Sequence, residues 1–231
     1  MAKTQDDKTT FAARLRDVGT KSYHHKHPFH LLMNRGKLTR KAIRGWVANR
    51  FYYQKNIPVK DAALISNCPV REVRRVWLHR LIDHDGTREG EGGIEAWLRL
   101  AAACGLSKDE VIDERHVLPA VRFAVDAYVN FARLQPWPVA IASSLTELFA
   151  PDLMSERLAA FKKYYSWVRP EGFDYFQRRV TQARADSQEA LELTLNWCNT
   201  PALQDQAVGA LSFKCDVLWS MLDGIQEKYV K

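Results

Sequence analysis

The sequence has few of the features that mark secreted, membrane or redox-active proteins. Its 231 residues include only four cysteines, Cys68, Cys104, Cys198 and Cys215, and no two of them form a C-x-x-C pair. The N-terminus does not follow the basic-then-apolar order of a secretory signal peptide. No uncharged apolar run is long enough to span a bilayer. These absences predict a soluble, cytoplasmic protein whose reduced cysteines act as small apolar side chains.

Other absences narrow the fold and the chemistry. No segment of strand length alternates apolar and polar residues, and no repeat, low-complexity tract or flexible linker is present. The glycine-rich stretch at residues 86–93 follows no strand, which argues against a dinucleotide-binding loop. A di-iron site in a helical bundle requires Glu-x-x-His pairs, and the sequence contains none. We therefore expect neither a nucleotide-binding fold nor a di-iron centre.

What the sequence does contain is helical periodicity along almost its whole length. Between Pro119 and Leu134, apolar residues recur at intervals of three and four, which is the pattern of one buried helical face. Ser107 and Glu110 have the spacing of a capping box. We predict a single all-α domain, residues 1–231, that forms a compact bundle. Its helices should lie near 9–20, 39–67, 70–83, 93–103, 107–113, 119–134, 138–149, 151–164, 170–198 and 201–229, with Pro58 kinking or splitting the second.

The charge of the chain favours an anionic partner. There are 34 Lys and Arg against 27 Asp and Glu, a net charge of +7, which suits nucleic acid, an anionic membrane or an acidic small molecule. A nucleic-acid site is disfavoured, because the basic clusters lack interleaved aromatic residues and match no known motif. We read these clusters as solvated surface: Arg71, Arg74, Arg75, Lys162 and Lys163.

Three cations stand where an apolar residue is expected. Lys214 lies on the apolar face of the last helix, four residues after Ala210 and three before Val217. Arg50 and Arg179 occupy equivalent places on two other helices, beside aromatic residues. A long side chain on such a face often extends its charged end to solvent, which accounts for any one of these residues. Three of them on three helices together predict a polar cavity for a polyanion.

Histidine is the remaining chemical signal. His84 lies between Asp83 and Asp85, which predicts a raised basicity and a role as general base. His24, His25, His27 and His30 cluster near the N-terminus, where one of them could serve as the axial ligand of a haem. For the four clustered histidines, a hydrogen-bonded structural role is the alternative interpretation.

Several long stretches resemble the pyrroloquinoline-quinone (PQQ) synthase family, over a span from about Phe11 to Tyr229. They include YHHKHP at 23–28, RGWVANRFYYQ at 44–54, IDHDG at 82–86, GGIEAW at 92–97, ERHVLP at 114–119, RFAVDAY at 122–128, SSLTELFAP at 143–151, FK at 213–214 and LWSMLD at 218–223. The resemblance implies a compact seven-helix bundle of the haem-oxygenase-like class, assembled as a homodimer. It implies the final step of PQQ biosynthesis, in which ring closure and eight-electron oxidation of a tricarboxylate quinone precursor consume O2 and release H2O2.

The same resemblance implies roles for individual residues. The substrate-binding positions would be Tyr23, Arg50, Gln54, Lys60, Tyr128, Glu147, Arg157 and Lys214, and the catalytic positions His84, Tyr175, Arg179 and His24. The cations among them would neutralise carboxylates, and Arg179 with Tyr175 would stabilise charge on reduced oxygen. No cofactor or metal is implied, because the quinone itself carries the electrons. The implied partners are the substrate, O2, a second copy of the chain, and a small peptide-chaperone protein of the pathway, fused or separate.

One position departs from the family pattern. Met154 stands where the family has a histidine shortly after residues 149–151, and a thioether cannot transfer a proton. We expect that histidine to be dispensable here, because Arg157 and the other site residues remain. The alternatives are that His24 or a water molecule takes over its task, or that catalysis is slowed. Two alternative functions stay open: a thiaminase-like hydrolase, which would need an activated cysteine, and a non-catalytic carrier of haem or quinone.

Overall fold

The computed structural model describes residues 5–230, apart from the side chains of residues 181–186. Residues 1–4 and 231, at the ends of the predicted domain 1–231, lie outside the described residues. The elements are α1 (Lys8–Ser22), η1 (His24–Lys26), α2 (Pro28–Asn34), α3 (Arg40–Asn67), α4 (Arg71–Asp85), α5 (Gly92–Ala103), α6 (Lys108–Ile112), α7 (Pro119–Leu134), α8 (Trp137–Ala142), η2 (Ser143–Phe149), α9 (Ala150–Tyr164), η3 (Pro170–Phe173), α10 (Asp174–Trp197) and α11 (Pro201–Tyr229), where η marks a 3-10 helix.

The predicted all-α class is confirmed, and the helix count is corrected. The described residues form eleven α-helices, rather than seven, and no strand. Three of the eleven, α2, α6 and α8, have seven residues or fewer, which accounts for most of the difference. No helix in the described part of the chain is long and apolar enough to cross a lipid bilayer.

Local details add to these predictions or differ from them. Helix α3 continues through Pro58, so of the two predicted effects of this proline, splitting does not occur. The helix predicted at 138–149 is divided into α8 and the 3-10 helix η2, and 3-10 turns commonly follow an α-helix end. Helix α2 was not predicted; it begins at Pro28, and the ring nitrogen of His27 caps it by accepting from the Phe29 amide.

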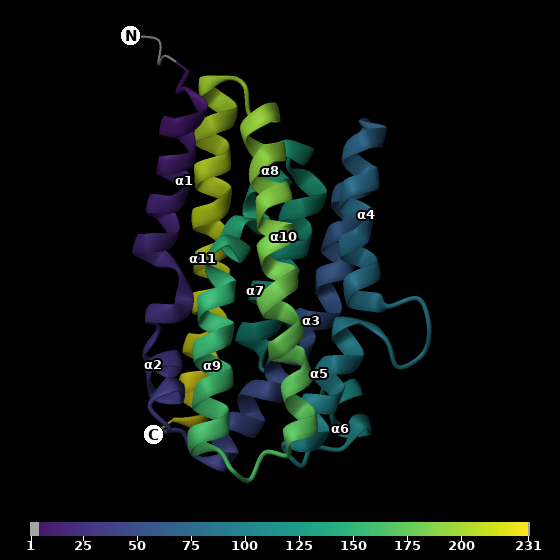
Figure 1. Ribbon diagram of the computed structural model, residues 1–231, viewed down its shortest axis with the longest axis vertical. Coiled ribbons are helices and arrows are strands. Elements are labelled where there is room, and N and C mark those ends of the chain that lie inside the picture. The colour runs from purple at the N-terminus through teal and green to yellow at the C-terminus, as the bar shows by residue number, and fades with distance from the viewer. Residues whose placement is uncertain (1–4, 231) are drawn as a thin grey trace.

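The long helices lie side by side along the longest axis of the molecule (Figure 1). The interior holds two large apolar clusters and a smaller third one, made of Tyr23, Leu153 and Leu218. The first includes Trp46, Trp97 and Phe161, and the second includes Leu15 and Leu211. Both α3 and α11 pass through both clusters, because each has apolar residues of one cluster towards one end and of the other cluster towards the other end.

Between the two clusters, the same helices carry polar side chains. On α3 the stretch between them contains Gln54, Lys60 and Asp61, all buried. On α11 the corresponding buried residue is Lys214, which lies between Leu211 of one cluster and Val217 of the other. The fold therefore holds a layer of buried polar groups, which we call the polar layer, between the two large apolar clusters. Polar groups buried in this way require specific partners.

A close helix contact fixes the start of α10, the helix that carries Tyr175 and Arg179. Gly172, in η3, is buried against α5. A Cβ atom built on Gly172 would lie 2.6 Å from the Cβ atom of Ala103 and 3.2 Å from the Cα atom of Leu100. Because these neighbours are near the α5 backbone, they cannot turn aside as the end of a long side chain could.

We predict that Gly172→Ala destabilises the protein by about 1–3 kcal/mol through overpacking. The matched control is Gly209→Ala, in the interior of α11, where an added Cβ atom has no neighbour within 4 Å. This control should stabilise by about 0.5–1 kcal/mol, because alanine loses less backbone entropy than glycine. Urea unfolding of both variants measures the two effects. An undiminished free energy of unfolding for Gly172→Ala would contradict the close contact.

Candidate functional site

A small cavity of about 50 Å³ opens onto the polar layer. Seven of the predicted site residues line it: Tyr23, His24, Arg50, His84, Glu147, Tyr175 and Arg179. Met154 lines it as well, at the position where the sequence departs from the family pattern. A larger cavity of about 400 Å³ lies near Arg44 and Tyr229 and contains none of the predicted residues. We place the site at the smaller cavity, because the unusual buried charges surround it.

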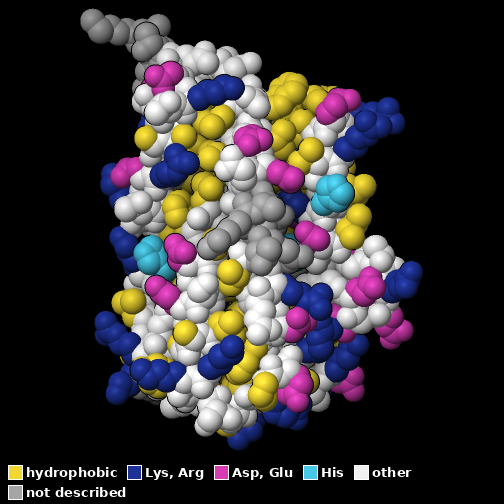
Figure 2. Space-filling view, in the orientation of Figure 1, with side chains coloured by type: hydrophobic (Ala, Val, Ile, Leu, Met, Phe, Trp, Pro, Cys, Tyr) yellow, Lys and Arg dark blue, Asp and Glu magenta, His cyan; other side chains and the backbone are white. Residues whose placement is uncertain are grey.

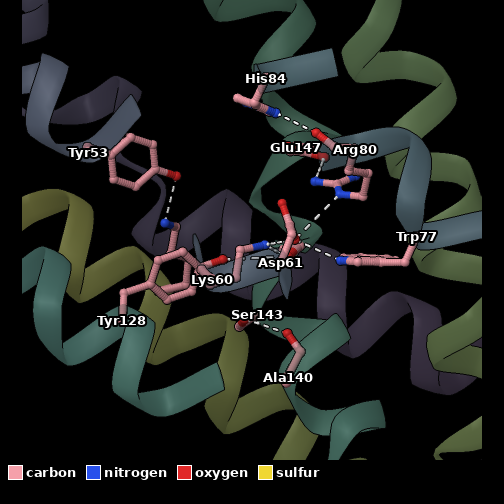
Figure 3. Close-up of polar contacts among 12 residues, drawn as sticks. Tyr53, Lys60, Asp61, Trp77, Arg80, His84, Tyr128, Ala140, Ser143 and Glu147 are labelled. Carbon is pink, nitrogen blue, oxygen red and sulfur yellow. Dashed lines mark hydrogen bonds and ion pairs between the residues drawn. The ribbon is translucent and has the colours of Figure 1, made fainter. Parts of the chain in front are cut away.

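Asp61 is a fully buried carboxylate, with an exposed fraction of 0%, at the centre of a group of polar contacts (Figure 3). Its Oδ1 atom accepts a hydrogen bond from Trp77 Nε1 at 2.7 Å and another from Lys60 Nζ. Arg80 Nε lies 3.9 Å from the same oxygen. Lys60 Nζ also donates to Ser144 Oγ at 3.0 Å. Burial is the largest influence and lowers the pKa of Lys60, but Asp61 and Tyr128 together outweigh it, so the net direction is upward. Lys60 is therefore a cation whose charge the protein already neutralises.

Arg80 links this carboxylate to the cavity. Its Nη2 atom donates to Glu147 Oε2 at 2.6 Å, and Arg179 Nη2 donates to the other oxygen, Oε1, at 3.2 Å. Burial raises the pKa of the Glu147 carboxyl, but the two guanidinium groups outweigh burial and lower it to about 2. Asp61, Arg80, Glu147 and Arg179 thus form a line of alternating charge, which we call the charge line.

Lys214 differs from Lys60 because it has no carboxylate partner among the described residues. It is 1% exposed, donates to the hydroxyl of Tyr53 at 2.7 Å, and lies 3.3 Å from the centre of the Tyr128 ring. Burial, followed by repulsion from Arg50 and Lys60, lowers the pKa of Lys214 well below its ordinary value. The aromatic rings hold the Lys214 amine in place, and an anionic ligand would favour its protonated form.

Two arginines show the same lack of a counter-charge within the described part of the chain. Arg157 is 3% exposed, packs over the Trp46 ring, and donates from Nη2 to His30 Nε2 at 3.0 Å. Burial, and then Arg50, lower its pKa to about 10. The Arg50 guanidinium lies 4.0 Å from the centre of the Tyr53 ring. A buried cation without a counter-ion, such as Arg157, is costly, so its arrangement beside the half-buried Arg50 suits an anionic ligand.

The structure corrects the predicted basicity of His84. Burial, and then Arg179, lower its pKa to about 4, and the adjacent Asp83 and Asp85 do not offset this. His84 Nδ1 lies 2.9 Å from the carbonyl oxygen of Arg80. Because a carbonyl only accepts, Nδ1 carries the proton and Nε2 carries the free electron pair. At neutral pH, His84 is therefore uncharged, with its free electron pair at Nε2.

His24 presents unsatisfied hydrogen-bonding groups to the cavity. Both of its ring nitrogens are buried and have no hydrogen-bond partner among the described residues. Burial, followed by Arg50 and Arg157, lowers its pKa well below the ordinary value. Its backbone carbonyl accepts from His30 Nδ1 at 3.0 Å. A buried, unpartnered imidazole in a cavity is a binding group for a polar ligand.

The two remaining site tyrosines are held by hydrogen bonds from other elements. Gln54 Nε2 donates to the hydroxyl oxygen of Tyr175 at 2.8 Å, which leaves the Tyr175 O–H free to donate. The Tyr128 hydroxyl lies 3.5 Å from Ser144 Oγ, and the Tyr128 ring supports Lys214. Every predicted site residue therefore lines the cavity or contacts a residue of the polar layer.

Arg80 and Asp61 were not predicted as site residues, and His30, which contacts Arg157, was predicted only as a possible haem ligand or a structural residue. A sequence signal existed for Arg80, which lies three residues after Trp77 and four before His84, on the buried face of α4. On the surface, by contrast, basic and acidic side chains are interspersed across the face shown in Figure 2. The described residues contain no group of three or more His, Cys, Asp and Glu side chains that could hold a metal ion.

The helical arrangement is a haem-oxygenase-like fold, in agreement with solved structures. A domain of unknown function with a heme oxygenase-like fold from Shewanella denitrificans superposes with a TM-score of 0.75 at 16% identity, over 96% of this chain and 91% of that chain. A TenA homolog from Pseudomonas syringae pv. tomato gives 0.74 at 14% identity, over 98% and 100%. These likenesses concern the fold alone, and they confirm the predicted fold class.

The sequence profile of the TENA/THI-4/PQQC family matches residues 12–224, so the chain belongs to that family. Within it, similar curated proteins are named pyrroloquinoline-quinone synthase. The protein from Pseudomonas aeruginosa is 52% identical over 229 residues, covering 99% of this chain and 91% of the relative. The protein from Cronobacter sakazakii is 54% identical over 219 residues, covering 95% and 87%. The predicted resemblance is therefore confirmed.

We predict that the His84 ring titrates near pH 4, so that it stays neutral from pH 8 to pH 5. Removing the positive charge of Arg179 by Arg179→Gln should move this pKa upward, towards 6.5. NMR titration of the ring protons measures both values, with His84→Asn used to assign the resonance. A wild-type titration near 6.5, or no rise in Arg179→Gln, would contradict the electrostatic assignment.

Proposed function

We propose that the protein is a cofactor-independent oxidase, a pyrroloquinoline-quinone synthase, that closes the third ring of a tricarboxylate quinone precursor and oxidises it with O2. The observation that carries the proposal is the set of three cations without a carboxylate partner among the described residues: Arg50, Arg157 and Lys214. Their number equals that of the substrate carboxylates. Lys60, predicted to share this task, is neutralised by Asp61, and so we assign it to the floor of the site.

The cavity must widen to receive this substrate. Its volume is about 50 Å³, whereas ligand pockets typically measure about 300–1,000 Å³. Arg50 is only half-buried, and it has no hydrogen-bond or ion-pair partner among the described residues. We propose that the substrate carboxylates draw Arg50 and Lys214 from their positions beside Tyr53, which opens the space. Charge-assisted hydrogen bonds to the substrate then replace the weaker aromatic contacts.

The proposed chemistry uses His84 as the base. Its Nε2 atom accepts a proton from a ring carbon or nitrogen of the substrate, while the Arg80 carbonyl fixes the ring through Nδ1. Each two-electron oxidation of the new rings passes its electron pair to the quinone, which becomes a quinol with the addition of two protons. The quinol then transfers two electrons and two protons to O2, which yields H2O2 and regenerates the quinone. No other electron carrier is required.

Arg179 and Tyr175 are placed to assist the reduction of oxygen. Arg179 is held by Glu147, and the Tyr175 hydroxyl accepts from Gln54, so both groups are oriented before the reaction. A fixed guanidinium and a fixed O–H donor stabilise negative charge as it develops on oxygen. His24, with both nitrogens unpartnered among the described residues, is the proposed donor to substrate and a substitute for the histidine replaced by Met154.

The competing functions have less support. A thiaminase-like hydrolase needs an activated thiolate, whereas burial raises the pKa of Cys104, Cys198 and Cys215 to about 12. The pKa of Cys68 is also raised, and none of the four cysteines is among the residues that line the cavity. All four are free, which supports a reducing, cytoplasmic location as part of the proposal. The homodimer, the small peptide-chaperone partner and the absence of nucleic-acid and membrane partners stay predictions.

We predict that Lys214→Met weakens binding of the tricarboxylate quinone at least ~10-fold, because one charge-assisted contact is lost. The melting temperature of the ligand-free variant should not fall, since removing an uncompensated buried charge is neutral or stabilising. Exposed Lys162→Met is the control and should change neither quantity. Absorbance titration and calorimetry provide the two readings. Undiminished affinity in Lys214→Met would remove this residue from the site.

The function itself is tested by turnover without added cofactor. Metal-stripped protein is mixed anaerobically with the tricarboxylate precursor, and O2 is then admitted while absorbance and peroxide are followed. We expect PQQ and H2O2 to form, which would make Met154 compatible with catalysis. Binding without turnover would contradict the synthase proposal and favour a quinone carrier. A Soret band on haem titration, together with absent turnover, would favour a haem carrier.

A further inference from the structure

The side chain of His30 is 2% exposed and contacts Arg157, one of the three cations assigned to the substrate carboxylates. It belongs to neither the predicted substrate-binding residues nor the predicted catalytic residues. We propose that His30 is a positioning residue for substrate binding, because it fixes the Arg157 guanidinium with an uncharged acceptor and leaves the positive charge available to a carboxylate. This inference rests on the proposed function, and it adds to it the residue that orients one of the cations.

The two hydrogen bonds of His30 determine which ring nitrogen carries the proton. Nδ1 lies 3.0 Å from the backbone carbonyl oxygen of His24, which can only accept a hydrogen bond. Nε2 lies 3.0 Å from Nη2 of Arg157, and a guanidinium can only donate. Both contacts therefore require the same neutral form, with the proton on Nδ1 and the free electron pair on Nε2. A protonated ring would place an N–H group opposite the N–H group of Arg157.

The surroundings of the ring favour this neutral form. Burial is the largest influence and lowers the pKa of His30 well below its ordinary value, and Arg157 lowers it further. The hydrogen bond to the backbone of His24 raises the pKa but does not offset these effects. His30 is therefore an uncharged acceptor at neutral pH, and it cannot neutralise the charge of Arg157.

The other contacts of Arg157 leave its charge uncompensated as well. Nη1 donates to the thioether sulfur of Met154 at 3.9 Å, and such a sulfur is a weak acceptor. Nε is buried and has no hydrogen-bond partner among the described residues. Glu156 raises the pKa of Arg157, but burial and Arg50 outweigh it, and the pKa falls to about 10. The bond to His30 therefore orients the guanidinium, and Nε and Nη1 are left for the oxygens of a ligand.

His30 also connects three elements around the cavity. It lies on α2, holds the backbone of η1 at His24, and orients Arg157 on α9. His30 is not among the residues that line the cavity, whereas His24 is. One neutral ring therefore positions two groups of the site without occupying the space in which a ligand would bind.

The test compares two substitutions of nearly the same size that differ in charge. His30→Gln carries an amide oxygen that can accept from Arg157 while the side chain stays neutral. His30→Glu has the same reach but supplies a carboxylate, which pairs with Arg157 and takes up its charge. The probe is PQQ, the proposed product, titrated by absorbance under anaerobic conditions so that no turnover interferes. Calorimetry of the ligand-free proteins gives their melting temperatures.

Affinity and stability should move in opposite directions. We expect His30→Gln to bind PQQ within ~3-fold of the wild-type affinity, and His30→Glu to bind it at least ~10-fold more weakly, because a charge-assisted contact is lost. The melting temperature should be higher for His30→Glu than for His30→Gln, because the carboxylate pairs a buried cation. Equal affinities of the two variants would overturn the proposal. A lower melting temperature together with a lower affinity in His30→Glu would also overturn it, because the loss would then follow from disturbed packing.

A second measurement needs no ligand, and it decides the proposal if His30→Glu does not fold. Long-range proton–nitrogen correlation NMR spectra of the wild-type ring, assigned with His30→Gln, should show the neutral form with the proton on Nδ1. A proton on Nε2, or a charged ring at neutral pH, would overturn the role of His30 even if the wild type binds PQQ. No binding of PQQ by the wild-type protein would overturn the proposed function and the role of His30 together. Wild-type binding with equal affinities in the two variants would overturn the role of His30 alone.

Discussion

The ion pair between Arg80 and Glu147, at 2.6 Å, is the contact on which the rest of the site depends. It joins α4 to η2, and through Asp61 and Arg179 it extends to α3 and α10. Buried ion pairs contribute little net stability, because desolvation offsets the attraction between the charges. The charge line is therefore better understood as an arrangement that holds four elements in one relative position. It accounts for the low pKa of Glu147 and for the fixed place of Arg179.

The two apolar clusters make this arrangement possible. They lie on either side of the polar layer, so that α3 and α11 are anchored at both ends by burial of apolar surface. Such burial contributes about 25 cal/mol per Å², and this can offset the cost of keeping Arg157 and Lys214 without counter-charges. The site therefore keeps buried basic side chains without counter-charges inside a bundle that is otherwise well packed. Departures of this kind are expected where a ligand supplies the missing charge.

The sequence was sufficient for most of the fold, because helical periodicity is a local signal. It also located Arg50, Lys214 and Arg179, since a cation on an apolar stripe stands out. It missed the interaction of His30 with Arg157, which joins residues 127 positions apart. The predicted basicity of His84 was wrong for a geometric reason. Neighbours at i±1 on a helix point about 100° away, so Asp83 and Asp85 do not face the imidazole, whereas Arg179 on another helix does.

The three unneutralised cations have a consequence for the overall rate. Ring closure and oxidation, as proposed, leave all three carboxylates on the molecule, and so Arg50, Arg157 and Lys214 hold the finished quinone about as firmly as its precursor. Binding that is equally strong at every stage of the reaction helps the protein to bind a substrate present at low concentration, but it does not lower the activation free energy of the chemical step. Under the proposed function, product that is bound as firmly as precursor competes with it for the same three cations.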